Sequence, residues 1–593
     1  METETGSFCG EVAPWHGGGV PQPLPAAPAA ARQYYTQGWW RGETFVDDLR
    51  MRARQTPDAV AYVNVRAAGG RTEVRRVSFG ELGGLVERLA AVLWTWGVRP
   101  GDVVALRLPD QWEAAALWLA CSRVGAVVLS LPAGADRRED EVVLRGARAA
   151  VLVVASTGGG GPLVTPCPGA ETAEVGAGVR AGGSCGGTAV VELGELLERA
   201  RAARPLSDRH PRASADELVQ VVLTSGSTGR PKGVLHTANT LYASLRAARR
   251  LLPPRPVVTC MAALTHSAGL KYLTLMPLVT GTRSVMLTSE RGHDGDEWLD
   301  LMACHRVNCM VTLPVLLERL SAAQRRRPRD LSELRRILSV GAVMPASTAA
   351  QVRASLSDGL VNVYGMTEGG PLCSTRPDDP GARAEDGVGR PVGGTQVAVR
   401  DCGQRVNGLP TSVRVGRSPL GEVGEIHVRG PSLCRGMVEV PSWEPLWDPG
   451  RDDGWYATGD VGSCGEQGNI RYLGRIADRV GCGHLVPTAE VERELRGHPQ
   501  VCDVALIGVP DRQGHEAVCA VVVPTGAPPS LEQLWEHLRA RTVRQEYWPA
   551  RLAIAPALPR TGLGKVGKAE LRKQVIDGIW PAHGYDAMRS RPQ

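Results

Sequence analysis

The sequence predicts an α/β protein. A large N-terminal region of layered α/β sheets with a β-barrel-like part is followed by a small C-terminal α+β domain. Three patterns indicate this arrangement: a strand–helix–strand pattern over residues 103–131, short alternating segments after residue 391, and alternating helices and strands after residue 476. The chain has 593 residues, of which 43% are hydrophobic, and this composition excludes a mainly disordered protein.

The N-terminal region begins with a stretch rich in Gly, Pro and Ala, and residues 1–43 are expected to form a flexible arm. A helical pattern starts at Thr44, with Phe45 and Leu49 at apolar positions. Residues 103–108 are typical of a buried strand, a helix follows to about residue 123, and residues 126–131 form the next strand. This unit predicts a parallel sheet, and the spacing of Asp110 and Glu113 predicts a capping box at the helix start.

The remaining elements follow in order. A Gly-rich stretch over residues 156–188 is expected to be a flexible surface loop, and the segments after residue 391 indicate an antiparallel β region. Strands are expected at residues 151–155, 218–223, 308–313, 359–363, 396–399, 425–428, 503–509, 517–523 and 551–554, and C-terminal helices at 489–496 and 531–541.

Composition excludes several classes of protein. The formal net charge of +6 is weak for this length, and no basic run is interleaved with aromatics, so nucleic acid is not an expected partner. The arginines at 325–327 are expected to lie at a solvated helix end. The 14 cysteines show no CxxC pair, the N-terminus is acidic, and the most apolar window contains Arg123 and Pro132. We therefore expect a cytoplasmic protein with reduced thiols and without a membrane span.

Lysine is rare in this chain. It occurs at five positions, whereas lysine and arginine together number 68. A retained lysine can mark a place that needs a compact ammonium on a flexible stem. This favours functional roles for Lys232 and Lys565, which both stand in Gly-rich segments. The five lysines are Lys232, Lys271, Lys565, Lys568 and Lys573.

The strongest motif follows the strand at residues 218–223. Small hydroxyl residues and glycines leave backbone N–H groups free to surround phosphate oxygens, and Lys232 adds a cation. The P-loop pattern does not fit, because Gly233 follows this lysine where a P-loop has Ser or Thr. The phosphate-binding candidates are Thr224, Ser225, Gly226, Ser227, Thr228, Gly229 and Lys232.

This segment resembles the phosphate-binding signature of the adenylate-forming superfamily, which includes acyl-CoA synthetases, luciferases and the adenylation domains of peptide synthetases. Four further segments resemble that family's motifs in the same order, and the resemblance covers roughly residues 44–575, closest to medium-chain, cyclic or aryl-acid CoA ligases. They are residues 363–368, with Tyr364, Gly365, Met366, Thr367 and Glu368; residues 454–460, with Asp460; residues 474–478, with Arg475; and residues 559–565, with Lys565.

The resemblance implies a role for each residue. Tyr364 stacks on adenine, Thr367 meets the α-phosphate, Glu368 holds Mg²⁺, Asp460 accepts the ribose hydroxyls, and Arg475 reaches the nucleotide. Lys565, with Thr228 and Glu368, is the expected catalytic set. From the residues alone, Tyr364 could be a core aromatic, Asp460 a turn residue, and Lys565 a solvated cation.

The resemblance also implies a substrate pocket and an adenine wall. Gly341 and Ala342 are expected beside the adenine, and the pocket candidates are His266, Gly269, Val343 and Gly369. A satisfied core histidine is an equally good interpretation of His266.

The implied reaction has two steps. A carboxylate attacks the α-phosphorus of ATP, pyrophosphate leaves, and the C-terminal domain then rotates to present a thiol, usually that of CoA, to the acyl-adenylate. Expected units are a flexible arm at 1–43, an adenylate-forming domain at 44–474 and a mobile domain at 475–593. ATP and Mg²⁺ are the expected cofactors, with CoA or a carrier-protein thiol as acceptor of the acid.

Two departures concern the second step. Ala477 replaces the usual Asp or Lys of the hinge, and the loop at residues 478–484 is one residue shorter than usual. Three hypotheses stay open: an acid–thiol ligase; an ATP-dependent diazotase that activates nitrite and couples it to an amino-aryl carboxylic acid; and a non-catalytic nucleotide-binding homologue. The Arg-, Ala- and Gly-rich composition is typical of GC-rich bacteria, whose stand-alone ligases often serve secondary metabolism such as antibiotic biosynthesis. The oligomeric state stays open.

Overall fold

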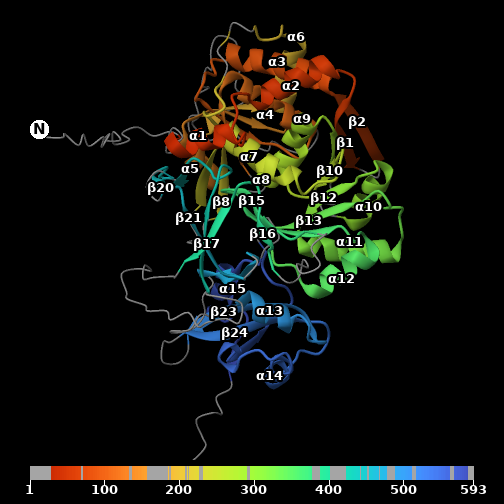
Figure 1. The fold of residues 1–593 in the computed structure, drawn as a ribbon, viewed down its shortest axis with the longest axis vertical. Helices are drawn as coiled ribbons and strands as arrows, with labels where there is room; N and C mark the ends of the chain where they lie inside the picture. Colours follow the sequence, from red (N-terminus) through yellow and green to blue (C-terminus); the bar gives the residue numbers. More distant parts are fainter. Residues whose placement is uncertain are drawn as a thin grey trace, which may run out of the picture.

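The computed structural model describes most of the chain, and the description below concerns those residues. Within them, the strands form two nine-stranded sheets and two four-stranded sheets (Figure 1). The described residues are 20, 28–68, 71–131, 137–155, 184–185, 188–207, 210, 213–225, 231–289, 294–376, 387–400, 423–440, 442–449, 453–465, 468–476, 486, 488–510, 516–560 and 566–584.

The first nine-stranded sheet has the order β16-β15-β14-β13-β12-β10-β11-β1-β2. Its central strands, from β14 to β1, are parallel, and the outer pairs are antiparallel. The carboxyl ends of the central strands therefore meet at one edge, where ligands bind in open α/β sheets. The strands are β1 (Val60–Ala68), β2 (Arg71–Ser78), β10 (Val257–Cys260), β11 (Arg283–Ser289), β12 (Cys309–Thr312), β13 (Arg336–Val340), β14 (Leu360–Met366), β15 (Gly370–Ser374) and β16 (Arg390–Pro391).

The second nine-stranded sheet has the order β20-β19-β9-β8-β4-β3-β5-β7-β6. Strand β3 precedes α4 in the chain and β4 follows it, and the two strands pair in parallel. This confirms the predicted strand–helix–strand unit. The strands are β3 (Val103–Arg107), β4 (Val127–Ser130), β5 (Ala149–Val154), β6 (Ser184–Cys185), β7 (Thr188–Glu192), β8 (Leu218–Ser225), β9 (Pro231–Thr237), β19 (Met437–Glu439) and β20 (Pro445–Trp447).

One large apolar core joins the two sheets. It contains residues of β1, β3, β10 and β14 together with residues of α2, α3, α4, α7 and η1. Burial of this much apolar surface is the main force that holds the sheets and helices together. The helices of this region are α1 (Pro28–Thr36), α2 (Phe45–Gln55), α3 (Phe79–Thr95), α4 (Trp112–Val124), α5 (Arg137–Ala147), α6 (Leu193–Ala202), α7 (Ala238–Arg249), α8 (Ser267–Gly269), the π-helix η1 (Leu270–Leu275), α9 (Met276–Thr280), α10 (Gly295–Cys304), α11 (Pro314–Arg326) and α12 (Ala346–Ser355).

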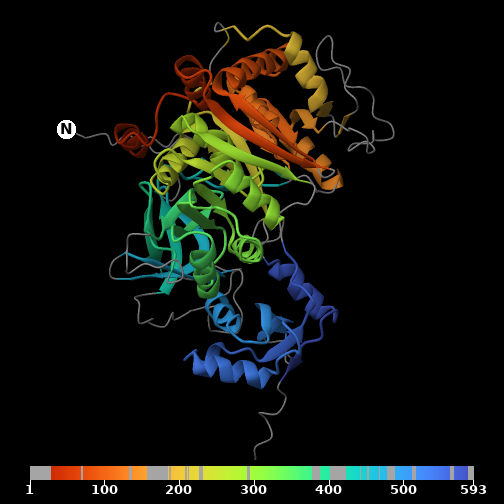
Figure 2. The same ribbon diagram turned by 90° about the vertical axis from the view of Figure 1, so that its right-hand side faces the viewer.

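An antiparallel sheet and a C-terminal α+β unit complete the fold. The sheet, in the order β17-β18-β21-β22, confirms the antiparallel region expected after residue 391. The C-terminal unit lies at one end of the long axis, in blue in Figures 1 and 2. Its elements and those of the sheet are β17 (Gln396–Arg400), β18 (Val423–Arg429), β21 (Tyr456–Cys464), β22 (Ile470–Arg475), α13 (Thr488–Leu495), β23 (Val501–Pro510), β24 (Glu516–Pro524), α14 (Leu531–Ala540), η3 (Gln545–Tyr547), β25 (Arg551–Ile554), α15 (Lys568–Ile576) and β26 (His583–Gly584).

Part of the expected N-terminal arm is ordered. Residues 28–36 form helix α1, and Trp39 and Trp40 are buried. The indole N–H of Trp40 donates to the carbonyl of Pro431, 2.9 Å away. The prediction of a loose arm is therefore wrong for this segment, because two indoles after the helix bury their apolar surface.

Two other expectations need correction. Asp110 does not cap α4: Gln111 holds the N-cap position, and Asp110 Oδ1 accepts from Leu264 N at 2.6 Å. Most of the Gly-rich stretch 156–188 lies outside the described residues, but Ser184–Cys185 forms strand β6 against β7.

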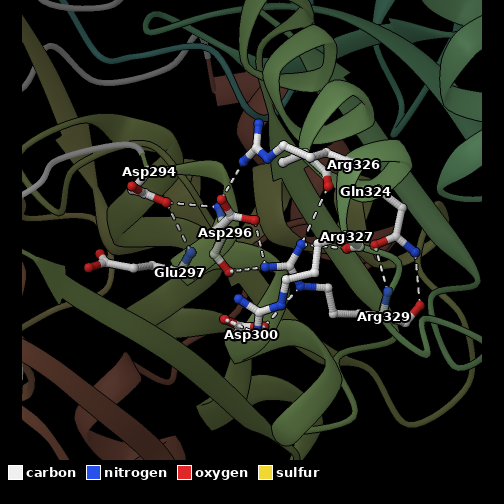
Figure 3. Close-up of polar contacts among 9 residues, drawn as sticks. Asp294, Asp296, Glu297, Asp300, Gln324, Arg326, Arg327 and Arg329 are labelled. Carbon is white, nitrogen blue, oxygen red and sulfur yellow. Dashed lines mark hydrogen bonds and ion pairs between the residues drawn. The ribbon is translucent and has the colours of Figure 1, made fainter.

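The arginines at 325–327 lie at the solvated end of α11, as expected. Arg326 and Arg327 are about two-thirds exposed, and they pair with Asp296 and Asp300 of α10 (Figure 3). Arg329, whose side chain is 6% exposed, also contacts both carboxylates, with Nη2 2.6 Å from Asp296 and Nε 2.9 Å from Asp300. This network fastens α10 to α11 and is structural.

No helix among the described residues has the length and apolar character needed to cross a membrane.

Candidate active site

The predicted phosphate-binding segment lies where β8 leads into β9. Strand β8 ends at Ser225 and β9 begins at Pro231, and the antiparallel register places Thr224 opposite Lys232. Both Thr224 and Lys232 are half-buried. Four of the predicted residues of this segment, Gly226, Ser227, Thr228 and Gly229, lie outside the described residues.

The second predicted motif lies at the carboxyl end of β14. Tyr364, Gly365 and Met366 are the last residues of this strand, and Thr367 and Glu368 follow in the turn to β15. Strand β13 ends beside β14 in parallel, so Gly341, Ala342 and Val343, which follow it, emerge at the same edge of the sheet. Gly341 has a φ of +80°, Ala342 is exposed, and Val343 is half-buried. The structure thus brings these two predicted segments to the ligand-binding edge.

Three predicted residues form one polar cluster. The Tyr364 hydroxyl donates to Asp460 Oδ2 at 2.6 Å, and Arg475 Nε lies 3.0 Å from Asp460 Oδ1. Asp460 and Arg475 are cross-strand partners of β21 and β22, so strand pairing itself holds this ion pair. Burial, together with the Asp460 charge, raises the pKa of Tyr364 well above its ordinary value, which keeps the phenol protonated as a donor.

Glu368 is influenced by charges of both the Asp460–Arg475 pair and the predicted phosphate-binding hairpin. Burial raises the pKa of this carboxyl, whereas the charges of Arg475 and Lys232 lower it. The Tyr456 hydroxyl donates to Glu368 Oε1 at 3.4 Å. Glu368 is therefore near enough to Arg475 of β22 and Lys232 of β9 to be influenced by both positive charges.

The predicted substrate segment starts at His266, just before α8. His266 is half-buried, and burial lowers the pKa of its imidazole. Gly269 is explained by packing, because a Cβ on it would lie 2.0 Å from the carbonyl oxygen of Ala263. Gly369 is buried in the turn between β14 and β15.

A small cavity of about 20 Å³, roughly the room of one water molecule, lies beside this segment. Its lining is mostly apolar and includes Leu106, Trp118, Leu264, Thr265, Leu270 and Thr274.

The predicted catalytic lysine and the hinge lie outside the described residues. Lys565 is flanked by Arg560 and Val566, which form an antiparallel bridge. Ala477 and residues 478–484 are likewise undescribed. The structure therefore brings together the predicted residues of β8, β9, β14, β21 and β22.

Four nearby residues were given no role in the sequence analysis. Tyr456 contacts Glu368, and the ring of Tyr472 lies 6.2 Å from that of Tyr364. His236 Nε2 lies 2.8 Å from the Thr367 carbonyl oxygen, and Lys271 lies beside Gly370. The scarcity of lysine in the sequence is the one signal that could have indicated a role for Lys271. A single histidine in an apolar strand, such as His236, gives no such signal.

Comparisons with known proteins agree with this geometry. Residues 49–438 match the AMP-binding enzyme family and residues 490–565 match the AMP-binding enzyme C-terminal domain. The chain is 29% identical to a medium-chain fatty-acid–CoA ligase of Escherichia coli (92% of each chain covered). It is 31% identical to a salicylyl-CoA synthase / salicylate adenylyltransferase of a Streptomyces species (93% of this chain and 97% of that one).

A solved structure supports the fold as well. The ATP-bound MatB of Rhodopseudomonas palustris matches with a TM-score of 0.72 and 26% identity, over 90% of this chain and 99% of that one. The family match covers more than half of the chain. The chain therefore belongs to the AMP-binding enzyme family, and it is an AMP-forming ligase of the adenylate-forming superfamily.

Proposed function

We propose that this enzyme activates an aryl, cyclic or medium-chain carboxylic acid as its acyl-adenylate and transfers the acyl group to CoA or a carrier-protein thiol. The observation that carries the proposal is the convergence at one site of Lys232, Asp460 and Arg475 from three strands with Glu368 from the turn after β14. The names of the relatives in Escherichia coli and Streptomyces support the substrate class. The cytoplasm, where ATP and CoA are both present, is the proposed location.

The first step joins the acid to AMP. One carboxylate oxygen attacks the α-phosphorus of ATP, the bond to the bridging oxygen breaks, and pyrophosphate leaves. Catalysis of such a transfer depends mainly on positioning and on neutralising charge. Lys232 and the segment from Thr224 to Gly229 hold the β- and γ-phosphates, and Asp460 accepts the ribose hydroxyls in place of the Tyr364 hydroxyl.

Glu368 fits a role as the protein ligand of Mg²⁺. Among the described residues no group of three His, Cys, Asp or Glu side chains is placed to hold a metal ion. This suits Mg²⁺, which is held by one or two carboxylates together with substrate phosphates and water. When bound, the ion would neutralise phosphate charge, and its own charge, like those of Arg475 and Lys232, would favour the ionised form of Glu368, whose pKa burial raises.

The second step releases AMP. We propose that Lys565 bridges the carboxylate and the α-phosphate in the first step, and that rotation of the C-terminal domain, from residue 475 on, then removes it. The thiol sulfur attacks the acyl carbon and forms the thioester bond, while the thiol proton is released. The bond between the acyl carbon and the oxygen on phosphorus breaks, and AMP leaves with that oxygen.

Product analysis tests this function. The purified enzyme is incubated with ATP, Mg²⁺ and a panel of acids (benzoate, salicylate, ferulate and octanoate), with and without CoA, and nucleotides and thioesters are identified by mass spectrometry. We expect AMP and pyrophosphate with at least one acid, and the matching CoA thioester when CoA is present.

Two further reactions separate the alternatives. Incubation with ATP, nitrite and an aminobenzoate tests the diazotase hypothesis, and ATP–pyrophosphate exchange without a thiol tests for adenylation alone. AMP formed only when nitrite is present would show a diazotase. A binding homologue would give neither AMP nor exchange with any acid or nitrite.

A further inference from the structure

Lys271 is a buried lysine that the proposed mechanism does not use. It is the second residue of η1 (Leu270–Leu275), and it is 5% exposed. π-Helices are rare and occur frequently at functional sites. The helix directly follows the predicted substrate segment around His266, so Lys271 belongs to the same part of the fold.

The ammonium group lies against the turn that carries the nucleotide motif. Its Nζ donates to Ser244 Oγ of α7 at 3.1 Å. A Cβ on Gly370, the first residue of β15, would lie 2.9 Å from this Nζ. Gly370 pairs with Met366 of the nucleotide motif and directly follows the pocket candidate Gly369. The ammonium of Lys271 therefore lies near both the nucleotide motif and the predicted substrate pocket.

The charge of Lys271 has no anionic partner among the described residues. An ammonium has three N–H donors, and one of them is used, by a neutral hydroxyl. The titratable groups that face it are His236 at the end of β9 and the Cys260 thiol of β10. Burial lowers the pKa of His236 to about 4 and raises that of Cys260 to about 12, so both are neutral at pH 7. Asp110, which acts on Cys260, accepts instead from Leu264 N.

Two arginines with little exposed side-chain surface are arranged differently. Arg123, which is 3% exposed, pairs with the Glu87 carboxylate at 3.2 Å, and Arg107 pairs with Asp140. A buried charge without such a partner is costly, and burial lowers the pKa of Lys271 to about 8. Two N–H groups and an uncompensated charge thus remain for a ligand.

We propose that Lys271 is a specificity-determining residue that binds a second oxygen anion of the acid substrate, a carboxylate or phenolate in addition to the carboxylate that is adenylated. This inference rests on the proposed function, and it narrows the substrate class to acids with two acidic oxygen groups. The ammonium would then pair with the substrate as the buried arginines pair with their carboxylates.

The test compares matched acids in ATP–pyrophosphate exchange. 3-Hydroxybenzoate and salicylate each add one hydroxyl to benzoate, and isophthalate adds one carboxylate. Each of these four acids is measured with wild type, Lys271→Met and Lys573→Met. Lys573 is exposed on α15 and serves as the control. We expect wild type to prefer at least one of the substituted acids over benzoate. Lys271→Met should reduce kcat/KM for that acid at least about ten-fold and change it for benzoate by less than about two-fold, because a buried polar partner discriminates strongly.

The pH dependence of kcat/KM gives a second readout. A lysine with a purely structural role would not affect it. For the preferred acid, wild-type kcat/KM should fall above a pH of about 8, where the free enzyme loses the Lys271 proton, and this limb should be missing in Lys271→Met. Equal losses for all acids would overturn the inference and assign a structural role. If the variant does not fold, wild type alone decides, since absence of any preference for the substituted acids contradicts the inference. Absence of exchange with every acid would instead overturn the proposed function.

Discussion

His236 is a buried imidazole that connects three segments of the site. Its Nδ1 lies 3.0 Å from Thr240 Oγ1 at the start of α7, and its Nε2 lies 2.8 Å from the Thr367 carbonyl oxygen. The side chain is 1% exposed, and burial, assisted by the charge of Lys271, lowers the pKa of His236 to about 4. The folded protein therefore keeps this residue neutral at pH values where an unfolded histidine takes up a proton.

This shift predicts a loss of stability in mild acid. Between pH 6.5 and 4 the unfolded chain binds more protons at His236 than the folded one, so the free energy of unfolding falls as the pH falls. From pH 7 to pH 5 this residue should account for about 2 kcal/mol. Urea unfolding of wild type, His236→Gln and the exposed control His583→Gln at both pH values measures it. If the free energy of unfolding fell as much between pH 7 and pH 5 in His236→Gln as in wild type, the prediction would be contradicted.

Among individual residues, those that belong to sequence motifs could be assigned to the site from the sequence. Tyr364, Asp460 and Arg475 were expected at one nucleotide site, and the structure brings them into contact. His236 and Lys271 were not predicted, because their contacts depend on strands and helices far apart in the chain. Thr367, for instance, is 131 residues from His236. Neither residue forms part of a local pattern that indicates such a contact.

The turn between β14 and β15 carries Thr367 and Glu368 and leads into Gly370. Gly370 has a φ of +68°, in the left-handed region that favours glycine. A Cβ there would lie 1.9 Å from Ser244 Oγ and 2.9 Å from Lys271 Nζ. Both the backbone conformation and the close approach of α7 and η1 therefore require glycine.

Gly370→Ala should destabilise the protein and weaken acid activation together. The positive φ alone costs about 1 kcal/mol, and the contact with Ser244 adds to it. Gly97→Ala is a matched control, because Gly97 has a φ of +89° and nothing lies within 4 Å of its added Cβ. Urea unfolding and ATP–pyrophosphate exchange should show a larger loss of stability and of kcat/KM for Gly370→Ala. Equal effects of the two substitutions would show that the packing around Gly370 is unimportant.

Elements with a strong hydrophobic pattern were predictable, whereas their caps and tertiary partners were not. The strand–helix–strand unit around α4 was expected from consecutive apolar residues, and β3 and β4 are parallel as predicted. Asp110 looked like a helix cap from its spacing to Glu113, but its carboxylate accepts from Leu264, which is 154 residues away. Helix α1 was missed because Gly- and Pro-rich neighbours suggested a loose arm, while Trp39 and Trp40 bind it to the core.

At the scale of the whole molecule, an ion pair joins the C-terminal unit to the antiparallel sheet. Arg471 of β22 pairs with Glu490 of α13 at 3.2 Å. Within the C-terminal unit, Lys568 Nζ lies 2.7 Å from Glu492 Oε1. Both side chains of the Arg471–Glu490 pair are about one-third exposed, and ion pairs of this kind contribute little to stability.

Lys565→Ala should separate ATP binding from adenylation. We propose that this side chain is brought to the nucleotide by the C-terminal unit, so its loss should slow acyl-adenylate formation by about two to three powers of ten, as one well-placed charge commonly contributes. ATP affinity, measured by calorimetry, should change little, and the control Lys573→Ala should keep normal activity. Pyrophosphate release by Lys565→Ala at a near-normal rate would show that Lys565 is not catalytic.

The central claim is that an oxygen of the acid attacks the α-phosphorus of ATP. It is tested most directly with the acid labelled with oxygen-18 in both carboxylate oxygens, under turnover with ATP and CoA, followed by mass spectrometry of the nucleotide product. We expect AMP that carries one labelled oxygen, because thiol attack at the acyl carbon leaves that oxygen on phosphorus. Unlabelled AMP, or ADP as the product, would contradict it.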